Sequence, residues 1–152
     1  MKQPTRILGV DYGTKRVGLA ITDADRRMAL PLTLHERGNL EHEAQFFRAL
    51  VETEDIALIL VGLPVHMSGD EGQKAAEARA YGKWLGETTN RPVAFWDERL
   101  TTSQAEQLLW DAGLTHKQRK ERRDKVAAQI LLQSYLEAGC PEIPDVRPLA
   151  DN

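Results

Sequence analysis

Residues 6–22 constrain the fold of this chain more than any other stretch. They predict a strand that ends at Asp11, a tight turn through Gly13, and a second strand that returns beside the first. The residues before Asp11 are apolar on both faces, which is typical of a central strand covered on both sides. A carboxylate at the end of such a strand costs free energy unless another group compensates its charge. We expect a divalent metal ion to be that group.

The length of 152 residues suits one domain, which we expect to span residues 1–140. Residues 141–152 contain three prolines and are expected to form a C-terminal tail. No apolar run is long enough to span a bilayer, and the N-terminus lacks a signal-peptide pattern. The single cysteine, Cys140, excludes an internal disulfide, and the four histidines show no zinc-binding spacing. These features favour a cytoplasmic protein that does not associate with membranes.

The periodicity of the apolar residues predicts an α/β fold. The first three strands have short connections and form an antiparallel meander, in which Pro31 places the third strand at an edge of the sheet. Asn39 is suited to cap a helix, and Thr115 and Gln118 have the spacing of a capping box. We expect strands at residues 6–12, 16–22, 28–34, 56–61 and 93–96, a glycine-rich loop at 62–72, and helices near 40–51, 73–87, 103–113 and 116–138.

The acidic residues at the ends of the strands are expected to converge. Strands joined through a helix usually run parallel, so the first, fourth and fifth strands would end at the same edge of the sheet. That edge would gather Asp11, the loop at 62–72 and the pair Asp97 and Glu98. Ligands bind at this edge in open α/β sheets. Because neighbouring strand residues point to opposite faces, we expect only one member of the pair to enter the site.

The last helix offers a further carboxylate, Asp124. It shares a helical face with Ala128 and Leu131, so we expect it to point along the apolar stripe and not toward water. A salt bridge with a basic neighbour is the alternative. If Asp11, Glu98 and Asp124 cluster at the sheet edge, their mutual repulsion favours binding of a cation.

The chemistry predicted for these acids is hydrolysis of a nucleic-acid backbone. Oxygen ligands suit Mg²⁺ or Mn²⁺. Two such ions about 4 Å apart can hold the attacking and leaving oxygens of a phosphodiester during in-line displacement. We therefore expect Asp11, Glu98 and Asp124 to be both the catalytic residues and the metal ligands of a two-ion site.

A basic cluster surrounds Asp124 in the sequence. Residues 116–125 contain six lysines or arginines and two acids, and Arg119, Arg122 and Arg123 are candidate phosphate contacts. A local positive patch can hold phosphates although the net charge of the chain is -3. The alternative is that this segment is simply the solvated start of a helix.

Four segments resemble one protein family, the YqgF/RuvX family, a branch of the ribonuclease H-like fold related to RuvC-type Holliday junction resolvases. They span nearly the whole chain, in the order in which the family has them. The segments are residues 9–18 (GVDYGTKRVG), 61–64 (VGLP) with Met67 and Gly69, 96–102 (WDERLTT), and 124–128 (DKVAA) with 130–136 (ILLQSYL).

The resemblance implies a ribonuclease H-like, five-stranded mixed sheet whose first three strands are antiparallel, flanked by helices. It implies a nuclease that uses Mg²⁺ or Mn²⁺ and matures the 5′ end of precursor 16S ribosomal RNA. The acidic positions of the family match Asp11, Glu98 and Asp124, which favours Glu98 over Asp97 as the second acid. The expected partner is structured precursor RNA or branched DNA, bound by a monomer or a homodimer.

Further residues near the expected site are assigned by residue type and position. The loop departs from the family pattern at His66 and Ser68, which leaves its substrate contacts open. Three basic residues are candidate substrate contacts, with a surface charge as the alternative for each: Lys15, Arg16 and Arg99. Four residues are expected to shape the turn and the loop: Gly13, Gly62, Pro64 and Gly69.

Three other functions compete with this interpretation. The first is a Holliday junction resolvase that cuts branched DNA. The second is a nucleotide-binding module, because the Asp-x-Gly-Thr hairpin also resembles the phosphate loop of the actin, sugar-kinase and heat-shock ATPase group. Those proteins need two facing domains, and ATP binding does not account for Asp124. The third is a protein that binds RNA without cutting it.

Overall fold

The computed structural model of the chain describes residues 4–100 and 115–141, without the side chains of Arg119, Lys120 and Lys125. The helix expected at residues 103–113 and the tail from residue 142 onward lie outside the described residues. The predicted division into a domain and a tail therefore stays a prediction.

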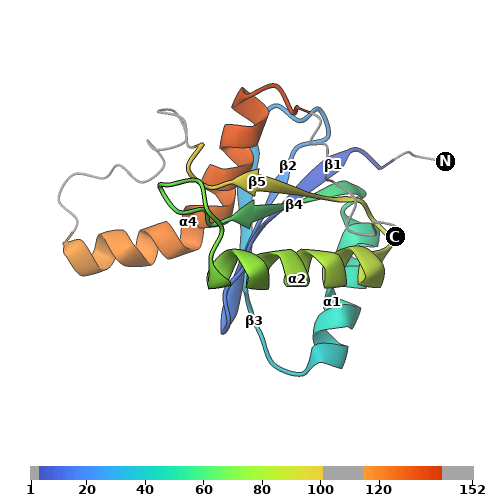
Figure 1. The fold of residues 1–152 in the computed structure, drawn as a ribbon. Coiled ribbons are helices and arrows are strands. Elements are labelled where there is room, and N and C mark those ends of the chain that lie inside the picture. The colour runs from blue at the N-terminus through green and yellow to red at the C-terminus, as the bar shows by residue number, and fades with distance from the viewer. Residues whose placement is uncertain (1–3, 101–114, 142–152) are drawn as a thin grey trace.

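A five-stranded mixed sheet forms the centre of the molecule (Figure 1). The strands β1 (Arg6–Asp11), β2 (Arg16–Thr22) and β3 (Ala29–Glu36) form the expected antiparallel meander. The strands β4 (Ile56–Leu63) and β5 (Val93–Asp97) run parallel to β1. The strand order β3-β2-β1-β4-β5 confirms that β3 lies at an edge and that β1, β4 and β5 end together.

The edge strand β3 accommodates Pro31 at an irregularity in its pairing. The register between β2 and β3 shifts between Leu19 and Ala20, and Ala20 then lies opposite Pro31. A proline has no N–H to donate to the ladder, so an edge strand with a bulge tolerates it. The strand extends two residues beyond the predicted end because Glu36 still pairs with Arg16.

The helices begin and end at the residues that the capping patterns indicate. Asn39 accepts hydrogen bonds from the first turn of α1 (Leu40–Thr53). The left-handed residue Asn90 ends α2 (Gln73–Thr89). Thr115 and Gln118 form the predicted capping box at the start of α4 (His116–Glu137).

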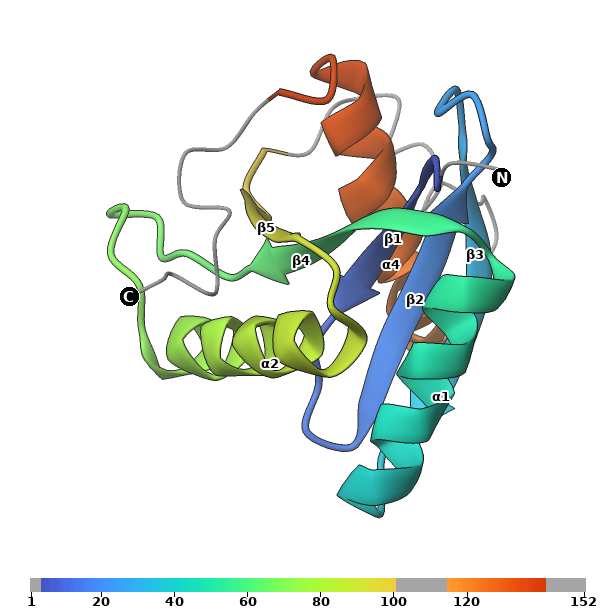
Figure 2. The same ribbon diagram turned by 90° about the vertical axis from the view of Figure 1, so that its right-hand side faces the viewer.

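The helices cover both faces of the sheet (Figure 2). The helices α1 and α2 pack on one face and α4 packs on the other, so the molecule has three layers and two apolar cores. Side chains alternate along each strand. In β1, Leu8 and Val10 face α1 and α2, whereas Ile7 faces α4. By the same alternation, Asp11 is on the α4 side of the sheet.

Gly9 lets α4 lie directly on β1. A Cβ atom added at Gly9 would stand 3.1 Å from the Cβ of Leu132 and 3.2 Å from the carbonyl oxygen of Ala128. A larger residue at position 9 would therefore push the helix away from the strand. This close packing positions α4, which carries Asp124, beside the strand that carries Asp11.

Candidate active site

Asp11 and Glu98 come from the two strands that flank β4. Val10 pairs with Val61 in the parallel register, so Asp11 follows beside Gly62. On the other side, the backbone N–H of Glu98 donates to the carbonyl of Leu63 at 3.1 Å, which continues the pairing of β4 and β5. The register therefore places Asp11 beside Gly62 and Glu98 one residue beyond the pair of Leu63 and Asp97, so both acids are at the carboxyl edge of the sheet.

Gly62 provides the space into which Glu98 points. A Cβ atom added at Gly62 would stand only 2.7 Å from Oε2 of Glu98, closer than real side-chain contacts. Although the residue as a whole keeps exposed surface, this carboxylate oxygen lies against the backbone of β4. The absence of a side chain at position 62 thus determines where the carboxylate of Glu98 lies.

Asp97 and Glu98 lie in opposite environments. The guanidinium of Arg99 binds the Asp97 carboxylate, with a shortest contact of 2.7 Å from an Nη atom to Oδ2. Hydrogen bonds from Arg99 hold the pKa of Asp97 below its usual value. Burial, followed by the charges of Asp11 and Asp97, raises the pKa of Glu98 to about 7. The charge of Asp97 is therefore balanced by a neighbouring cation, whereas Glu98 lines a cavity together with Asp11, whose charge raises its pKa further.

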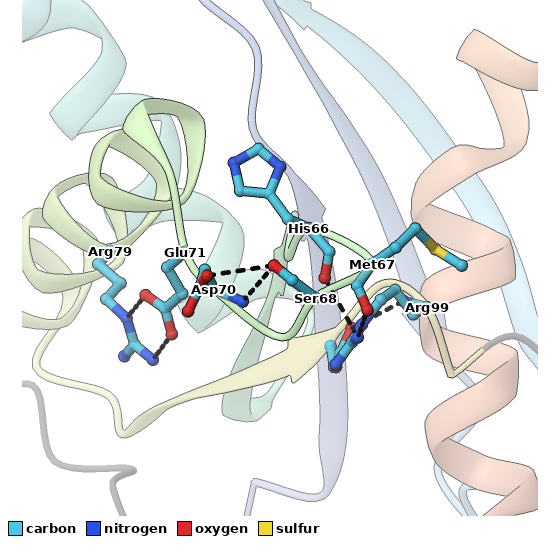
Figure 3. Close-up of polar contacts among 8 residues, drawn as sticks. His66, Met67, Ser68, Asp70, Glu71, Arg79 and Arg99 are labelled. Atoms are coloured by element: carbon cyan, nitrogen blue, oxygen red, sulfur yellow. Dashed lines mark hydrogen bonds and ion pairs between the residues drawn. The ribbon is translucent and has the colours of Figure 1, made fainter.

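Arg99 also connects the end of β5 to the loop that follows β4 (Figure 3). One of its Nη atoms donates to the carbonyl oxygens of His66 at 3.2 Å and Met67 at 3.4 Å. Its remaining N–H groups face Asp97. We expected Arg99 to contact phosphate. In the structure its guanidinium instead binds loop carbonyls and a carboxylate, and these contacts connect the loop to the end of β5.

The loop between β4 and α2 is closed on itself by short-range contacts. The hydroxyl of Ser68 donates to the carboxylate of Asp70 at 3.2 Å, and Arg79 binds Glu71 through two hydrogen bonds (Figure 3). Gly69 has a φ of +95°, which favours glycine. The two positions that differ from the family pattern, His66 and Ser68, therefore lie in a loop that is held by hydrogen bonds within it and by Arg79 and Arg99.

Asp11 is the more buried of the two strand-end acids. Burial, followed by the charge of Asp124, raises the pKa of Asp11 to about 6. The charge of Asp11 in turn contributes to the raised pKa of Glu98. Raised pKa values in buried acids that repel each other are typical of functional sites.

Asp124 lies near Asp11, but the expectation that it points away from water is wrong. Asp124 is exposed. Among the described side chains of α4 the buried residues begin at Ala128, and Figure 1 shows the first turns of the helix projecting beyond the sheet. The apolar stripe continues toward Asp124 in the sequence, but none of the five described strands lies beneath that part of the helix (Figure 1).

In the described residues the three acids form two electrostatic pairs that share Asp11, and they do not form one group of three. The charge of Asp124 acts on Asp11, and the charge of Asp11 acts on Glu98. In residues 4–100 and 115–141, no three His, Cys, Asp or Glu side chains lie close enough together to hold one ion. The charge of Asp11 is thus linked to each of the other two acids, the convergence of all three stays a prediction, and this part of the chain contains no ready-made three-carboxylate group.

A cavity of about 400 Å³ opens at Asp11 and Glu98. Its walls come from the turn after β1, the end of β4 and the first turns of α2, and include Lys74 and Glu77. Lys74 makes no ion pair or hydrogen bond with the described residues. Lys74 and Glu77 were not predicted from the sequence. Their position was a usable signal, because a helix that follows a strand-end loop begins at the edge of the sheet where ligands bind. The remaining lining residues are Tyr12, Gly13, Thr14, Gly62, Pro64 and Ala78.

Of the other predicted residues, Gly13, Gly62 and Pro64 line this cavity, whereas the basic ones with described side chains are not among its lining residues. A Cβ added at Gly13 would stand 2.3 Å from the carbonyl oxygen of Arg16, so the turn requires glycine. Arg16 approaches Glu36 at 3.8 Å with both side chains exposed, and Lys15 is exposed in the same turn. On α4, Arg123 is exposed and Arg122 is partly buried, whereas the side chain of Arg119 is outside the described set.

The family model for RuvX, described as "Holliday junction resolvase", matches residues 5–138. The chain belongs to the RuvX family. The resemblance read from the four sequence segments is confirmed.

Several curated proteins resemble this RuvX chain over most of their length. Each of the following carries the name "Putative pre-16S rRNA nuclease". The relative from Rhodopirellula baltica is 46% identical over 88% of this chain and 77% of its own length. The relative from Protochlamydia amoebophila is 41% identical, covering 91% and 97%. The relative from Agrobacterium fabrum is 40% identical, covering 89% and 86%.

The solved structure of T. thermophilus RuvC in complex with a Holliday junction substrate matches with a TM-score of 0.54 at 12% identity. The match covers 91% of the RuvX chain and 98% of the RuvC chain. It shows the fold, and the predicted ribonuclease H-like architecture is confirmed. None of the helices in the described ranges is long and apolar enough to cross a membrane.

Proposed function

We propose that this protein is a divalent-metal-dependent endonuclease that hydrolyses phosphodiester bonds and processes the 5′ end of precursor 16S ribosomal RNA. One observation carries the proposal. Asp11 and Glu98 line the same cavity beside Gly62, and burial, followed by the charge of a neighbouring acid, raises the pKa of each: Asp124 acts on Asp11, and Asp11 acts on Glu98. Groups arranged in this way gain free energy when a cation neutralises their charge.

The chemistry of these side chains fits Mg²⁺ or Mn²⁺. Asp11, Glu98 and Asp124 offer only carboxylate oxygens, the ligands that these ions prefer. Asp11 would be the shared ligand, because it interacts with both of the other acids. When bound, such ions supply Lewis-acid stabilisation of the attacking and leaving oxygens of a phosphodiester.

The protein's own residues would bind and orient the substrate. Lys74 provides a cation on the wall of the cavity. It forms no ion pair with a carboxylate of the described residues, so it is available to bind a phosphate oxygen. Lys15 and Arg16 lie in the turn after Asp11, and Arg122 and Arg123 precede Asp124 on α4. We infer that the phosphate backbone runs between that turn and the first turns of α4.

The choice of ribosomal RNA rests on the relatives, whose shared name specifies a pre-16S rRNA nuclease. This substrate would place the protein in the cytoplasm, where ribosomes are assembled. The description of the family as Holliday junction resolvase favours a second candidate, cleavage of branched DNA. Both substrates would present phosphodiesters to the same acids.

The test compares two substrates with the same protein. Purified protein would be incubated with a precursor 16S rRNA fragment and, separately, with a four-way DNA junction, with Mg²⁺, with Mn²⁺ or with a chelator. We expect metal-dependent cleavage of the RNA at the 5′ side and at most slow cleavage of the junction. Preferential junction cutting would support the second candidate. Binding of RNA without cleavage, unchanged in Asp11→Asn, would overturn the nuclease proposal.

A further inference from the structure

A buried carboxylate lies behind the site and takes no part in the proposed reaction. Glu43, in the first turn of α1, has a side chain that is only 1% exposed. It accepts a hydrogen bond from the hydroxyl of Tyr81 on α2 and an ion pair from Nε of Arg37 at 3.3 Å. Burial, and then the bond to Glu43, raises the pKa of Tyr81 above its usual value, so Tyr81 remains a hydrogen-bond donor.

Arg37 extends from this buried carboxylate to the turn that follows Asp11. One Nη atom donates to the hydroxyl of Tyr12 at 3.3 Å and to the carbonyl oxygen of Gly13 at 3.4 Å. The backbone N–H of Arg37 donates to the carbonyl of Lys15 at 2.9 Å. Arg37 therefore contacts three of the four residues that separate the end of β1 from the start of β2.

Two aromatic rings, those of Tyr12 and Tyr81, pack against the guanidinium of Arg37. Its Cζ atom lies 5.3 Å from the ring centroid of Tyr12 and 4.9 Å from that of Tyr81. The two rings are themselves 4.9 Å apart. A planar guanidinium held by stacking and by directed hydrogen bonds has little freedom to move.

Stability alone gives no reason for this arrangement. Apolar residues of similar size often replace a buried ion pair with no loss of stability, because taking the charges out of water is unfavourable. Directed hydrogen bonds do what apolar contacts cannot, since they fix the positions of particular atoms. The atoms fixed here belong to Tyr12 and Gly13, which line the cavity immediately after Asp11.

We propose that Arg37, anchored by Glu43 and Tyr81, is a positioning residue that holds the turn at residues 12–15 and thereby sets the Asp11 carboxylate toward Glu98. This inference rests on the proposed function, because its consequence is the rate of cleavage. Arg37 does not line the cavity, so it acts through the turn and not on the substrate.

Arg91 offers a matched control at another place in the molecule. Its side chain is 19% exposed, against 21% for Arg37. Like Arg37, it binds backbone carbonyl oxygens, those of Ile56 and Thr89, and a glutamate, Glu52. Ile56 begins β4, Arg91 precedes β5, and Thr89 and Glu52 lie in the last turns of α2 and α1, away from the carboxyl edge that carries the acids.

The experiment compares Arg37→Met with Arg91→Met in the full chain. We expect both substitutions to lower the melting temperature by a few degrees. Only Arg37→Met should lower kcat for RNA cleavage, by tenfold or more, while KM changes less than threefold. Arg37→Lys should recover most of the melting temperature and little of kcat, because an ammonium that pairs with Glu43 cannot also reach Tyr12 and Gly13.

Hydrogen exchange in metal-free protein provides a readout that does not depend on activity. Peptides covering residues 9–17 should exchange faster in Arg37→Met and at the wild-type rate in Arg91→Met. If Arg37→Met does not fold, Tyr81→Phe tests the same network by removing a single hydroxyl, with the same changes expected at smaller size. Unchanged exchange in the turn, or equal losses of kcat in the Arg37 and Arg91 variants, would overturn the inference.

If the wild type cuts no substrate, the proposed function fails, and hydrogen exchange still decides whether Arg37 holds the turn.

Discussion

The carboxylate of Glu98 lies where a side chain at residue 62 would be. A Cβ on Gly62 would stand 2.7 Å from Oε2 and 3.2 Å from Cγ of Glu98. Since β4 lies between β1 and β5, this glycine also lies between the strand that ends at Asp11 and the strand that leads to Glu98. The site therefore depends on a missing side chain as much as on the acids that it contains.

Gly62→Ala should reduce cleavage much more than it reduces stability. The added methyl group meets the end of a flexible side chain, so Glu98 can move aside, at a cost of about 1 kcal/mol in folding free energy. The displaced carboxylate would leave its place beside Gly62 in the cavity, and we expect kcat to fall by about 100-fold, as when a transition-state contact is removed. Gly38→Ala is the control, because no atom lies within 4 Å of a Cβ at that position. Full activity in Gly62→Ala would show that the position of Glu98 is unimportant.

The two adjacent acids should respond differently to removal of their charge. Glu98→Gln should abolish cleavage and leave the fold intact. Asp97→Asn releases Arg99 from its partner and should loosen the loop after β4, with a modest loss of activity. Single-turnover rates measured for both variants test the assignment. The opposite ranking would make Asp97 the second acid.

The raised pKa values predict that metal-free protein becomes less stable as pH rises. Asp11 and Glu98 titrate near 6 and 7 in the folded state, above their usual values, so the folded state binds more protons than the unfolded state between about pH 4 and 7. The free energy of unfolding should therefore fall by about 2 kcal/mol from pH 5 to pH 8, allowing for screening by solvent. Denaturant titrations in chelator at several pH values measure this change, and Glu98→Gln should flatten it. A stability that rises over this interval in the wild type would contradict the arrangement.

Metal binding should reverse that instability. A ligand that binds only the folded state raises the melting temperature. We expect Mg²⁺ or Mn²⁺ at millimolar concentration to raise the melting temperature of the wild type but not of Asp11→Asn, as measured by thermal unfolding at about pH 8. Equal shifts in the two proteins would indicate that the ions bind elsewhere.

Lys74 should contribute to substrate binding through a phosphate. Lys74→Ala should weaken binding and reduce by about one the slope of log affinity against log salt concentration. Lys83→Ala removes the same charge from the same helix but outside the cavity lining, so its slope should stay at the wild-type value. Filter binding of the RNA fragment at several salt concentrations compares the two. Identical slopes in both variants would remove Lys74 from the interface.

Local patterns in the sequence predicted most of the fold. Asn39 and Thr115 cap helices where their hydrogen-bonding side chains indicate, and Pro31 lies in the edge strand that its missing N–H requires. The apolar run before Asp11 lies at the centre of the sheet. Each of these features depends on residues close in sequence and on a general rule of backbone hydrogen bonding.

The sequence by itself determined that Asp11 ends a buried strand and that parallel strands bring Glu98 to the same edge. Only the tertiary structure decided which charges are already paired: Arg99 is bound by Asp97 and loop carbonyls, Lys74 lines the cavity, and Asp124 is exposed where α4 extends beyond the sheet. The physical reason is the distance along the chain over which each feature is determined. Periodicity and capping are set by neighbours along the chain, whereas the pairing and burial of a charge depend on groups that only folding brings together.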